Sequence, residues 1–393
     1  ILGIKFEENG GLIHMPDRSR PLRILHIVGR MNRGGVETWL MNLLRTVSRD
    51  SWQMDFLVGD PTPADYDEEI RQRGARIFPC SLQNPFLYIF RLIGILRKFG
   101  PYDAIHSHVH HFSGITLLIA YWAGIPVRIA HSHSDTAGLD SKADWRRRLY
   151  LTLMKKLIDR YATVGMAVSR EAATALSNGN ASRLTWQVRH CGINLADYSH
   201  PVDREALRQE WGIPRTSFVI GHVGSFTLVK NHRFILQVAQ EVFRRKPDSR
   251  LVLVGDGRLR IDIENQAMRL GIVDRIVFTG KRADVPNLMG MMDVFLFPSL
   301  YEGLGLAVIE AQSAGLPILI ADSVPKETEV VSDLFVWMPL SQPPELWAEK
   351  CLQMVELKEN IAHLKPRRIL EESSFNIATN WHDLDRFYSG RSA

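Results

Sequence analysis

Short apolar segments alternate with amphipathic segments along most of this chain of 393 residues. In the first half the apolar segments read "LRILHIVG", "MDFLVG", "DAIHSH", "VRIAHSH" and "YATVGMAVS". Amphipathic stretches such as "GGVETWLMNLLRTV", "YDEEIRQRG" and "REAATALSN" follow them. Four to eight apolar residues ending in Gly, His or Pro are typical of buried strands, and the stretches after them have helical spacing. The alternation predicts a parallel sheet covered by helices.

The same alternation resumes at residue 218 with "FVIGHVG", "RLVLVGDG", "RIVFTG", "VFLFPS" and "LPILIAD". A polar stretch with several Gly and Pro residues, 189–217, separates the two series and is typical of a hinge. We therefore predict the α/β class, with two Rossmann-like, doubly wound parallel-sheet domains over 21–195 and 217–375, and a linker over 196–216. Parallel sheets bind ligands beyond the carboxyl ends of their strands, so the ligand site is expected in a cleft between the domains.

Composition fits a globular enzyme, with 45% hydrophobic and 23% charged residues. Cys80, Cys191 and Cys351 are far apart and form no metal-binding spacing, which favours a reducing cytoplasm. No run approaches the roughly 18 apolar residues of a membrane span. Residues 1–20 are too polar for a signal peptide and are interpreted as a leader or disordered segment, with Met15 as a candidate natural start.

Positive charge is concentrated in the first half, where residues 1–200 hold 25 Lys and Arg against 18 Asp and Glu. This excess favours a polyanionic partner, either membrane headgroups or nucleic acid. Residues 145–157 add an apolar stripe among basic residues, a pattern typical of a helix lying on anionic lipid. A core-packed helix with a solvated basic face explains the pattern equally well. The stripe consists of Trp145, Leu149, Leu153 and Leu157.

The stretch "YEGLGLAVIE", 301–310, is the strongest signal for a ligand site. Gly303 and Gly305 permit unusual backbone angles, and a helix starting near Leu304 would direct N–H groups and its positive dipole end toward an anion. Glu302 lies in the turn, and Glu310 lies about 12 Å further along by helical rise. Two carboxylates beside an anion-binding helix start suit a nucleotide sugar, whose hydroxyls lie on both sides of its phosphates. A solvated helix face is the alternative, although Val308, Ile309 and Ala311 give Glu310 apolar neighbours.

Two further segments could contact phosphate. Gly34 and Gly35 stand at a predicted helix start, where their N–H groups could approach an anion, although a tight turn would explain them as well. Their spacing matches neither the dinucleotide fingerprint nor the Walker A loop. Lys230, in "GHVGSFTLVKNH", could carry a positive charge toward the cleft, but a solvated surface lysine is the more ordinary reading.

Histidines cluster in "HSHVHH" and "HSHSD", 106–111 and 131–135. Strand alternation predicts His106, His108 and His110 on one side, and His131 and His133 together on the next strand. A zinc site is conceivable, but no ligand recurs at helical spacing to complete it. Histidines lining a cleft are the favoured interpretation.

Together these segments resemble the retaining glycosyltransferases of family 4, which have the GT-B fold of two facing Rossmann-like domains. The resemblance covers residues 22–390 and rests on "GGVE", "HSHSD", "AVSREA", "GHVG" with "KNH", "VLVGDG", "FTGKRADVPNLM" and the E-x7-E spacing of "EGLGLAVIE". It implies that the first domain takes the acceptor and the second the nucleotide sugar. It also implies that a terminal helix, 376–393, crosses back onto the first domain.

The resemblance further implies roles for individual residues. Glu302 would contact donor-sugar hydroxyls, Glu310 would bind the ribose, and either His133, which is favoured, or His131 would touch the reacting centre. Lys230 would hold the diphosphate. The remaining implied contacts are the amides of Gly303, Leu304 and Gly305 to the diphosphate, Gly34 and Gly35 for domain closure, and Lys281 and Arg282 beside the base.

One residue departs from the family pattern. Relatives often have Arg where this chain has Ser225, and that Arg shares the diphosphate charge. Loss of a charge-assisted contact to a leaving phosphate would cost a few kcal/mol of transition-state stabilisation. Arg30 and Arg33 are the nearest candidates by motif to replace it.

The resemblance thus implies a metal-independent transferase that needs no cofactor besides its nucleotide-sugar donor, with UDP as the expected nucleotide. A glycan or lipid-linked glycan hydroxyl would accept the sugar, as in cell-surface polysaccharide synthesis. The expected location is cytoplasmic and membrane-peripheral, with no nucleic-acid partner. A non-catalytic nucleotide-sugar or saccharide-binding protein and a nucleotide-sugar epimerase of the same architecture remain the alternatives.

Overall fold

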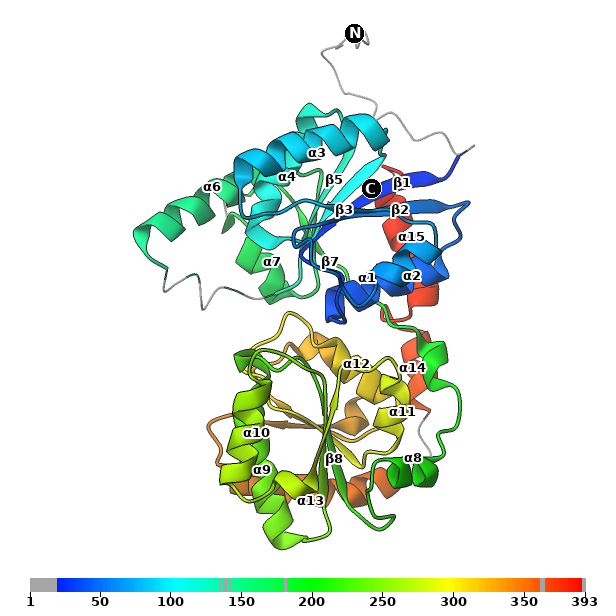
Figure 1. Cartoon of the computed structure of the whole chain (residues 1–393), viewed down its shortest axis with the longest axis vertical. Helices are drawn as coiled ribbons and strands as arrows, with labels where there is room; N and C mark the ends of the chain where they lie inside the picture. The colour runs from blue at the N-terminus through cyan, green and yellow to red at the C-terminus, as the bar shows by residue number, and fades with distance from the viewer. Residues whose placement is uncertain are drawn as a thin grey trace.

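The structure is a computed structural model that describes residues 20–134, 136, 140, 143–179, 182–360 and 365–390. Two α/β domains follow one another along the long axis, with the N-terminal domain uppermost in Figure 1. Of the predicted leader, 1–20, all but Arg20 lies outside the described residues. Arg20 belongs to the domain, because its guanidinium makes two hydrogen bonds of 2.8 and 2.7 Å to Asp103.

The N-terminal sheet has seven strands, all parallel, in the order β3-β2-β1-β4-β5-β6-β7. Buried apolar residues fill most of these strands, which is why the sheet needs helices on both faces. The strands are β1 Leu22–Val28, β2 Trp52–Val58, β3 Ile77–Pro79, β4 Ala104–Ser107, β5 Val127–Ser132, β6 Val164–Ala167 and β7 Trp186–Val188.

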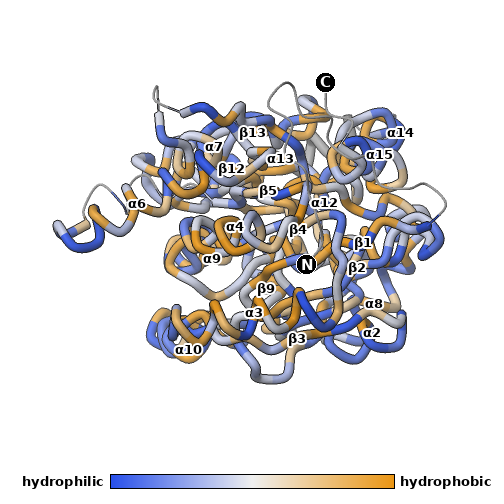
Figure 2. Tube along the Cα trace, turned by 90° about the horizontal axis from the view of Figure 1, so that it is seen from above, coloured by the Kyte–Doolittle hydropathy of each residue, from blue (hydrophilic) through white to orange (hydrophobic). Residues whose placement is uncertain are grey.

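Two helical layers cover this sheet. One face packs against α1 Gly35–Thr46, α2 Asp67–Gln72, α7 Arg170–Leu176 and the C-terminal α15 Ile377–Tyr388. The other packs against α3 Pro85–Phe99, α4 Ser113–Trp122 and α6 Trp145–Tyr161. A short 3-10 turn, η1 His110–Phe112, joins β4 to α4. Seen from above in Figure 2, hydrophilic segments, blue, lie mostly toward the rim of the molecule, and hydrophobic segments, orange, include parts of both helices and strands.

The C-terminal sheet has six parallel strands in the order β10-β9-β8-β11-β12-β13. Its strands are β8 Val219–Val223, β9 Arg250–Val254, β10 Ile276–Gly280, β11 Val294–Phe297, β12 Ile318–Ala321 and β13 Phe335–Met338. Its helices are α8 Arg204–Glu210, α9 His232–Arg245, α10 Arg260–Arg269, α11 Val285–Gly290, α12 Leu306–Ser313, α13 Pro344–Asn360 and α14 Pro366–Glu371. Short 3-10 turns are η3 Leu195–Tyr198, η4 Leu228–Lys230, η5 Val273–Arg275, η6 Lys326–Thr328 and η7 Ser332–Leu334.

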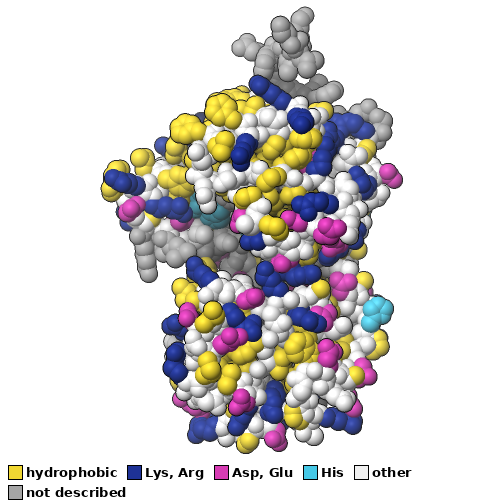
Figure 3. All heavy atoms as spheres, in the orientation of Figure 1, with side chains coloured by type: hydrophobic (Ala, Val, Ile, Leu, Met, Phe, Trp, Pro, Cys, Tyr) yellow, Lys and Arg dark blue, Asp and Glu magenta, His cyan; other side chains and the backbone are white. Residues whose placement is uncertain are grey.

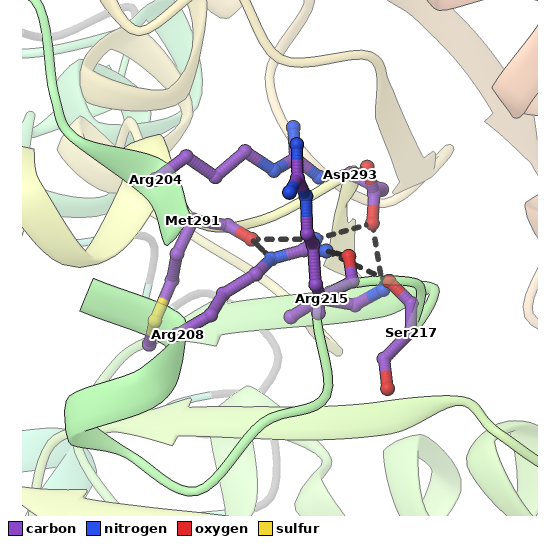
Figure 4. Close-up of polar contacts among 7 residues, drawn as sticks. Arg204, Arg208, Arg215, Ser217, Met291 and Asp293 are labelled. Atoms are coloured by element: carbon purple, nitrogen blue, oxygen red, sulfur yellow. Dashed lines mark hydrogen bonds and ion pairs between the residues drawn. The ribbon is translucent and has the colours of Figure 1, made fainter. Parts of the chain in front are cut away.

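A buried arginine attaches the linker helix α8 to the second sheet. Arg208 is 4% exposed and donates to the carbonyls of Arg215, Ser217 and Met291, and to the Asp293 carboxylate (Figure 4). The same carboxylate accepts the N–H of Val219 at the start of β8. A buried cation is tolerated here because its N–H groups are used in hydrogen bonds, so α8 is fixed to the C-terminal domain.

The last helix returns to the first domain. Helix α15 packs beside α1, and the indole of Trp52 on β2 donates to Asp385 of α15 at 2.9 Å. Residues 383–385, which match a metal-binding DxD pattern, therefore lie within a packed helix. The crossing brings Tyr388 under the carboxyl half of the N-terminal sheet, where it contacts the histidine cluster described below.

Candidate active site

Helix α12 begins against the N-terminal domain. Its cap, Gly305, has φ 90° and ψ 61°, a left-handed conformation that favours glycine, and makes no side-chain cap hydrogen bond. A Cβ on Gly303 would lie 1.9 Å from the His133 carbonyl oxygen, so glycine is required by close approach. A Cβ on Gly35, at the start of α1, would lie 3.6 Å from Leu306. The starts of α1 and α12 thus face one another between the domains.

Leu304 is held differently from its neighbours. Its side chain is 4% exposed and packs within the hydrophobic cluster of the N-terminal domain, together with Ile309 of α12. This apolar contact fixes the direction in which α12 points. The predicted ligand group of Leu304 is its backbone amide, and α12 begins two residues later than predicted, at Leu306 with Gly305 as its cap.

An ion pair stands at the base of the same turn. Lys230 Nζ lies 2.5 Å from Glu302 Oε1, and both side chains are largely buried. Lys230 also lies 4.8 Å from the ring centre of Phe297, whose ring would be 3.3 Å from a Cβ on Gly305. The Lys230 and Glu302 loops are joined by a hydrogen bond between Asn231 and the Pro298 carbonyl. The structure therefore brings together a helix start without a side-chain cap, a cation and a carboxylate.

Glu310 lies further along α12, in a partly buried environment. Burial, and secondarily the nearby carboxylate of Asp197, raises the pKa of Glu310 to about 7. Tyr198 is the other neighbour, and burial raises the pKa of its phenol well above the usual value. Glu310 thus faces η3 of the linker, so its environment differs from that of Glu302.

His131 belongs to a buried chain of three side chains. Its Nδ1 lies 3.0 Å from His106 Nε2, and His106 Nδ1 lies 2.6 Å from the Tyr388 hydroxyl of α15. His131 is 1% exposed, and its Nε2 has no hydrogen-bond partner among the described residues. Burial holds the pKa values of both histidines well below their usual value, so both rings are neutral.

His133 ends a second chain. His26 Nδ1 lies 3.1 Å from His108 Nε2, and His108 Nδ1 lies 2.9 Å from His133 Nε2. Burial lowers the pKa of His133 to about 3, so this ring is neutral as well. The backbone of His133 faces Gly303, whereas its ring turns toward His108 and Cys191. His133 is therefore the nearer of the two candidate histidines to the α12 start.

The predicted grouping of His110 was wrong. Strand β4 ends at Ser107, and His110 lies in η1 with φ 49°, its Nδ1 2.8 Å from that of His111. The strand alternation that unites His106 with His108, at 4.2 Å between ring centres, does not reach it. His131 and His133 lie on one side, at 3.9 Å, as predicted.

Nitrogens of His108, His131 and His133 lie within 4.8 Å of one another, as do those of His26, His106 and His108. Neutral imidazoles at this spacing could ligate a metal ion. Their ring nitrogens, however, are largely used in hydrogen bonds within the two chains, which accounts for the cluster without an ion.

Two acidic residues of this region were missed from the sequence. Glu37 folds over the start of α1, since a Cβ on Gly34 would lie 2.5 Å from its Oε2, and burial raises its pKa to about 7. Glu37 could have been found from the sequence, because it is the glutamate of the "GGVE" motif. Asp65 accepts from Lys281 Nζ at 3.0 Å and so links the two domains. Nothing local in the sequence could have paired residues so far apart.

The remaining predicted residues lie at the border of this region. Arg282 forms a two-point pair with Asp284 and stacks over Trp211, 5.4 Å from the ring centre. Ser225 is exposed. Of the proposed substitutes for its missing charge, Arg30 donates to the Pro63 carbonyl and Arg33 lies over the Tyr66 ring at 5.1 Å.

Two family profiles match consecutive parts of this chain. The family profile described as "Glycosyltransferase Family 4" matches residues 33–197, and "Glycosyl transferases group 1" matches residues 203–369. EpsF of Bacillus subtilis (strain 168), which carries the name of a glycosyltransferase, is 36% identical over 83% of this chain and 86% of its own. An Escherichia coli protein named UDP-Gal:alpha-D-GlcNAc-diphosphoundecaprenol alpha-1,3-galactosyltransferase is 25% identical over 77% of this chain and 79% of its own.

Solved structures show the same fold. HepE of Anabaena, crystallised with UDP and glucose, superposes with a TM-score of 0.78 at 20% identity, over 94% of this chain and 99% of HepE. The expected GT-B architecture is thereby confirmed. With its two family matches and its identity to EpsF, the chain belongs to glycosyltransferase family 4 and is an enzyme of the hexosyltransferase class.

Proposed function

We propose that this enzyme transfers a hexose from a UDP-sugar, with retention of anomeric configuration, to a hydroxyl of a glycan or lipid-linked glycan in cell-surface polysaccharide synthesis. The observation that carries the proposal is the Lys230–Glu302 pair at the uncapped start of α12, opposite the first domain. HepE was crystallised with UDP-glucose, and the E. coli relative is named for a UDP-galactose donor and a diphosphoundecaprenol acceptor, which supports this donor and acceptor class.

In the proposed reaction the donor diphosphate lies at the α12 start. Lys230 and the helix dipole stabilise the negative charge that grows on the diphosphate as the sugar–phosphate bond breaks. Glu302, released from its ion pair with Lys230, accepts hydrogen bonds from sugar hydroxyls. The acceptor oxygen bonds to the anomeric carbon on the face that the diphosphate leaves, and its proton passes to a donor phosphate oxygen. Glu302 is then an orienting group, and the protein need not supply a base.

The neutral histidines fit this scheme. His133 and His131 are assigned to the sugar side of the site because an uncharged imidazole can hydrogen-bond a sugar hydroxyl. Nε2 of His131 has no partner among the described residues, whereas the His133 ring would have to turn from His108 to make this contact. Glu310 is assigned to the ribose, and Lys281 and Arg282 to the base. Product release would require Lys281 to separate from Asp65 as the domains open.

A panel of nucleotide sugars, tested for binding and then for transfer with and without glycan acceptors, tests the proposal. Transfer from a UDP-sugar to an acceptor is the expected result. Saturable UDP binding without turnover would identify a non-catalytic binding protein, and a changed nucleotide sugar formed without acceptor would identify an epimerase.

Two substitutions test the residue assignments. Glu310→Ala should weaken binding of UDP itself, whereas Glu302→Ala should mainly weaken binding of the sugar-bearing donor, by about tenfold for a lost charged hydrogen bond. Equal effects of the two changes on UDP and on UDP-sugar would contradict the assignment.

A further inference from the structure

The outer layer of the N-terminal domain exposes large apolar side chains where a folded protein would normally bury them. Six of them, defined here as the docking face, are between 43% and 76% exposed. They come from the first halves of α3 and α6, and Figure 3 shows yellow side chains gathered over the upper left of the domain, where Figure 1 places these helices. The docking face consists of Phe86, Leu87, Phe90, Trp145, Leu149 and Leu153.

On α6 the exposed and buried residues occupy opposite sides. Leu151, Met154 and Ile158 point into the core. At about 3.6 residues per turn, Trp145, Leu149 and Leu153 lie on the side away from that core. Helix α6 therefore has two apolar faces, and the second has no protein partner among the described residues. This exposure excludes the core-packed interpretation for these three positions.

Helix α3 shows the same arrangement. Tyr88, Leu92 and Leu96 are buried, and Phe86 and Phe90 lie on the opposite side of the helix. Both α3 and α6 cover the same face of the sheet and flank α4. Because helices in parallel α/β sheets run opposite to the strands, their first halves lie at the carboxyl ends of the strands, beside the site. Tyr121 and Trp122 lie at the other end of α4 and are not part of the face.

The charge around the docking face selects its partner. Helices α3 and α6 carry nine Lys and Arg residues, of which Arg97, Lys98 and Arg160 stand in the last turns, away from the docking face. The other six outnumber the two acids at the start of α6, which are Asp140, 3.8 Å from Arg147, and the N-cap Asp144. Two copies of so basic a surface would repel one another. Apolar side chains surrounded by cations suit a surface with anionic headgroups over an apolar interior.

We propose that the docking face inserts into the anionic leaflet of a membrane and holds the site beside the bilayer. None of the described helices is both long and apolar enough to cross a membrane, so this contact would be peripheral. The inference joins the surface expected over residues 145–157 with α3, whose sequence "FLYIFRLIGILRK" is compatible with either a second such surface or a buried helix. It does not depend on the proposed transfer reaction, since it concerns a surface outside the donor site.

Co-sedimentation of the full chain with vesicles tests the proposal. We expect binding to phosphatidylcholine vesicles containing about 30% phosphatidylglycerol, loss of binding at about 0.5 M salt, and little binding to phosphatidylcholine alone. The variant Phe90→Ser, Leu149→Ser, Leu153→Ser should lower the partition coefficient by about tenfold or more. The matched control, Ile261→Ser with Met268→Ser on α10, alters exposed apolar residues of the other domain and should bind as the wild type does.

A charge variant tests the same face without changing its apolar residues. Arg146→Gln with Lys156→Gln should reduce binding by roughly tenfold, whereas Arg233→Gln with Arg269→Gln in the second domain should not. Failure of the wild type to bind anionic vesicles would overturn the proposal. Equal loss of vesicle binding in the test and control variants would also overturn it. So would a wild-type dimer that binds no vesicles and that dissociates in both the serine variant and the charge variant. The assay contains no donor or acceptor, so it leaves the transfer reaction untouched.

Discussion

The raised pKa of Glu310 gives this enzyme a pH-dependent stability that one substitution should remove. In the folded chain the carboxyl ionises near pH 7, because burial and Asp197 disfavour its charge, against a usual value of 4.5. A carboxyl with a raised folded pKa contributes stability that is complete below pH 4.5 and is lost as the pH rises through 7. The perturbation is Glu310→Gln, which keeps the shape of the neutral carboxyl and cannot ionise.

The structure sets the size of the effect. A shift from 4.5 to about 7 corresponds to about 3 kcal/mol between the two protonation states, an upper bound for a side chain that is not fully buried. Relative to wild type, Glu310→Gln should therefore be of similar stability at pH 5 and more stable at pH 8, by up to that amount. Glu37 shifts in the same direction in both proteins, so the comparison cancels its contribution.

Donor affinity should change with pH in the opposite direction from stability, rising as the pH rises. If Glu310 accepts the ribose hydroxyls as a carboxylate, a UDP-sugar binds better as the group ionises, and the Kd should fall about tenfold between pH 6 and 8 in the wild type. The titrated ligand should be a UDP-sugar and not UDP, because the phosphates of a UDP-sugar have no terminal ionisation near pH 6 that would add its own pH dependence. In Glu310→Gln the Kd should be weaker and nearly independent of pH.

Thermal unfolding from pH 5 to 8, with calorimetric titration of UDP-glucose at pH 6, 7 and 8, measures both effects. Glu349→Gln, an exposed glutamate on α13, is the matched control and should follow the wild type. Parallel stability and affinity curves for wild type and Glu310→Gln would refute the assigned burial and the ribose contact together. A difference in stability without one in affinity would refute the ribose contact.

Three further substitutions have defined outcomes. Gly303→Ala forces its Cβ against the His133 carbonyl, so the close approach of the two segments is lost and transfer should fall more than a hundredfold. An unchanged kcat/KM would contradict the close approach. Ser225→Arg should raise the kcat/KM for the donor by tenfold or more, because the guanidinium can make a charged hydrogen bond to a phosphate. No gain would show that another cation already contacts the diphosphate. Arg208→Met leaves buried carbonyls and the Asp293 carboxylate with fewer hydrogen-bond donors. It should lower the free energy of unfolding, measured by urea titration, by about 3 kcal/mol. Arg215→Met changes an exposed neighbour and should leave that free energy unchanged.

Local patterns were enough to predict most of the architecture. Buried strands such as β8 and β11 are recognisable in the sequence as short apolar runs. The start of α12 is recognisable from two glycines followed by an apolar helical segment. These features depend on alternation, helical period and glycine geometry, which a few neighbouring residues specify. Local pattern favoured a solvated Lys230, and only the family resemblance placed it at a common site with Glu302, with which it forms a largely buried ion pair.

The tertiary structure decided which residues from distant segments contact one another. His106 meets Tyr388, 282 residues away, because β1, β4 and β5 are adjacent and α15 returns beneath them. Lys281 meets Asp65 because the domains close, and Leu304 is buried by a domain to which it does not belong. The choice between a buried and an exposed stripe on α6 rested on which side α4 covers. Burial and pairing of this kind follow from strand order and domain contact, and no short stretch of sequence contains either.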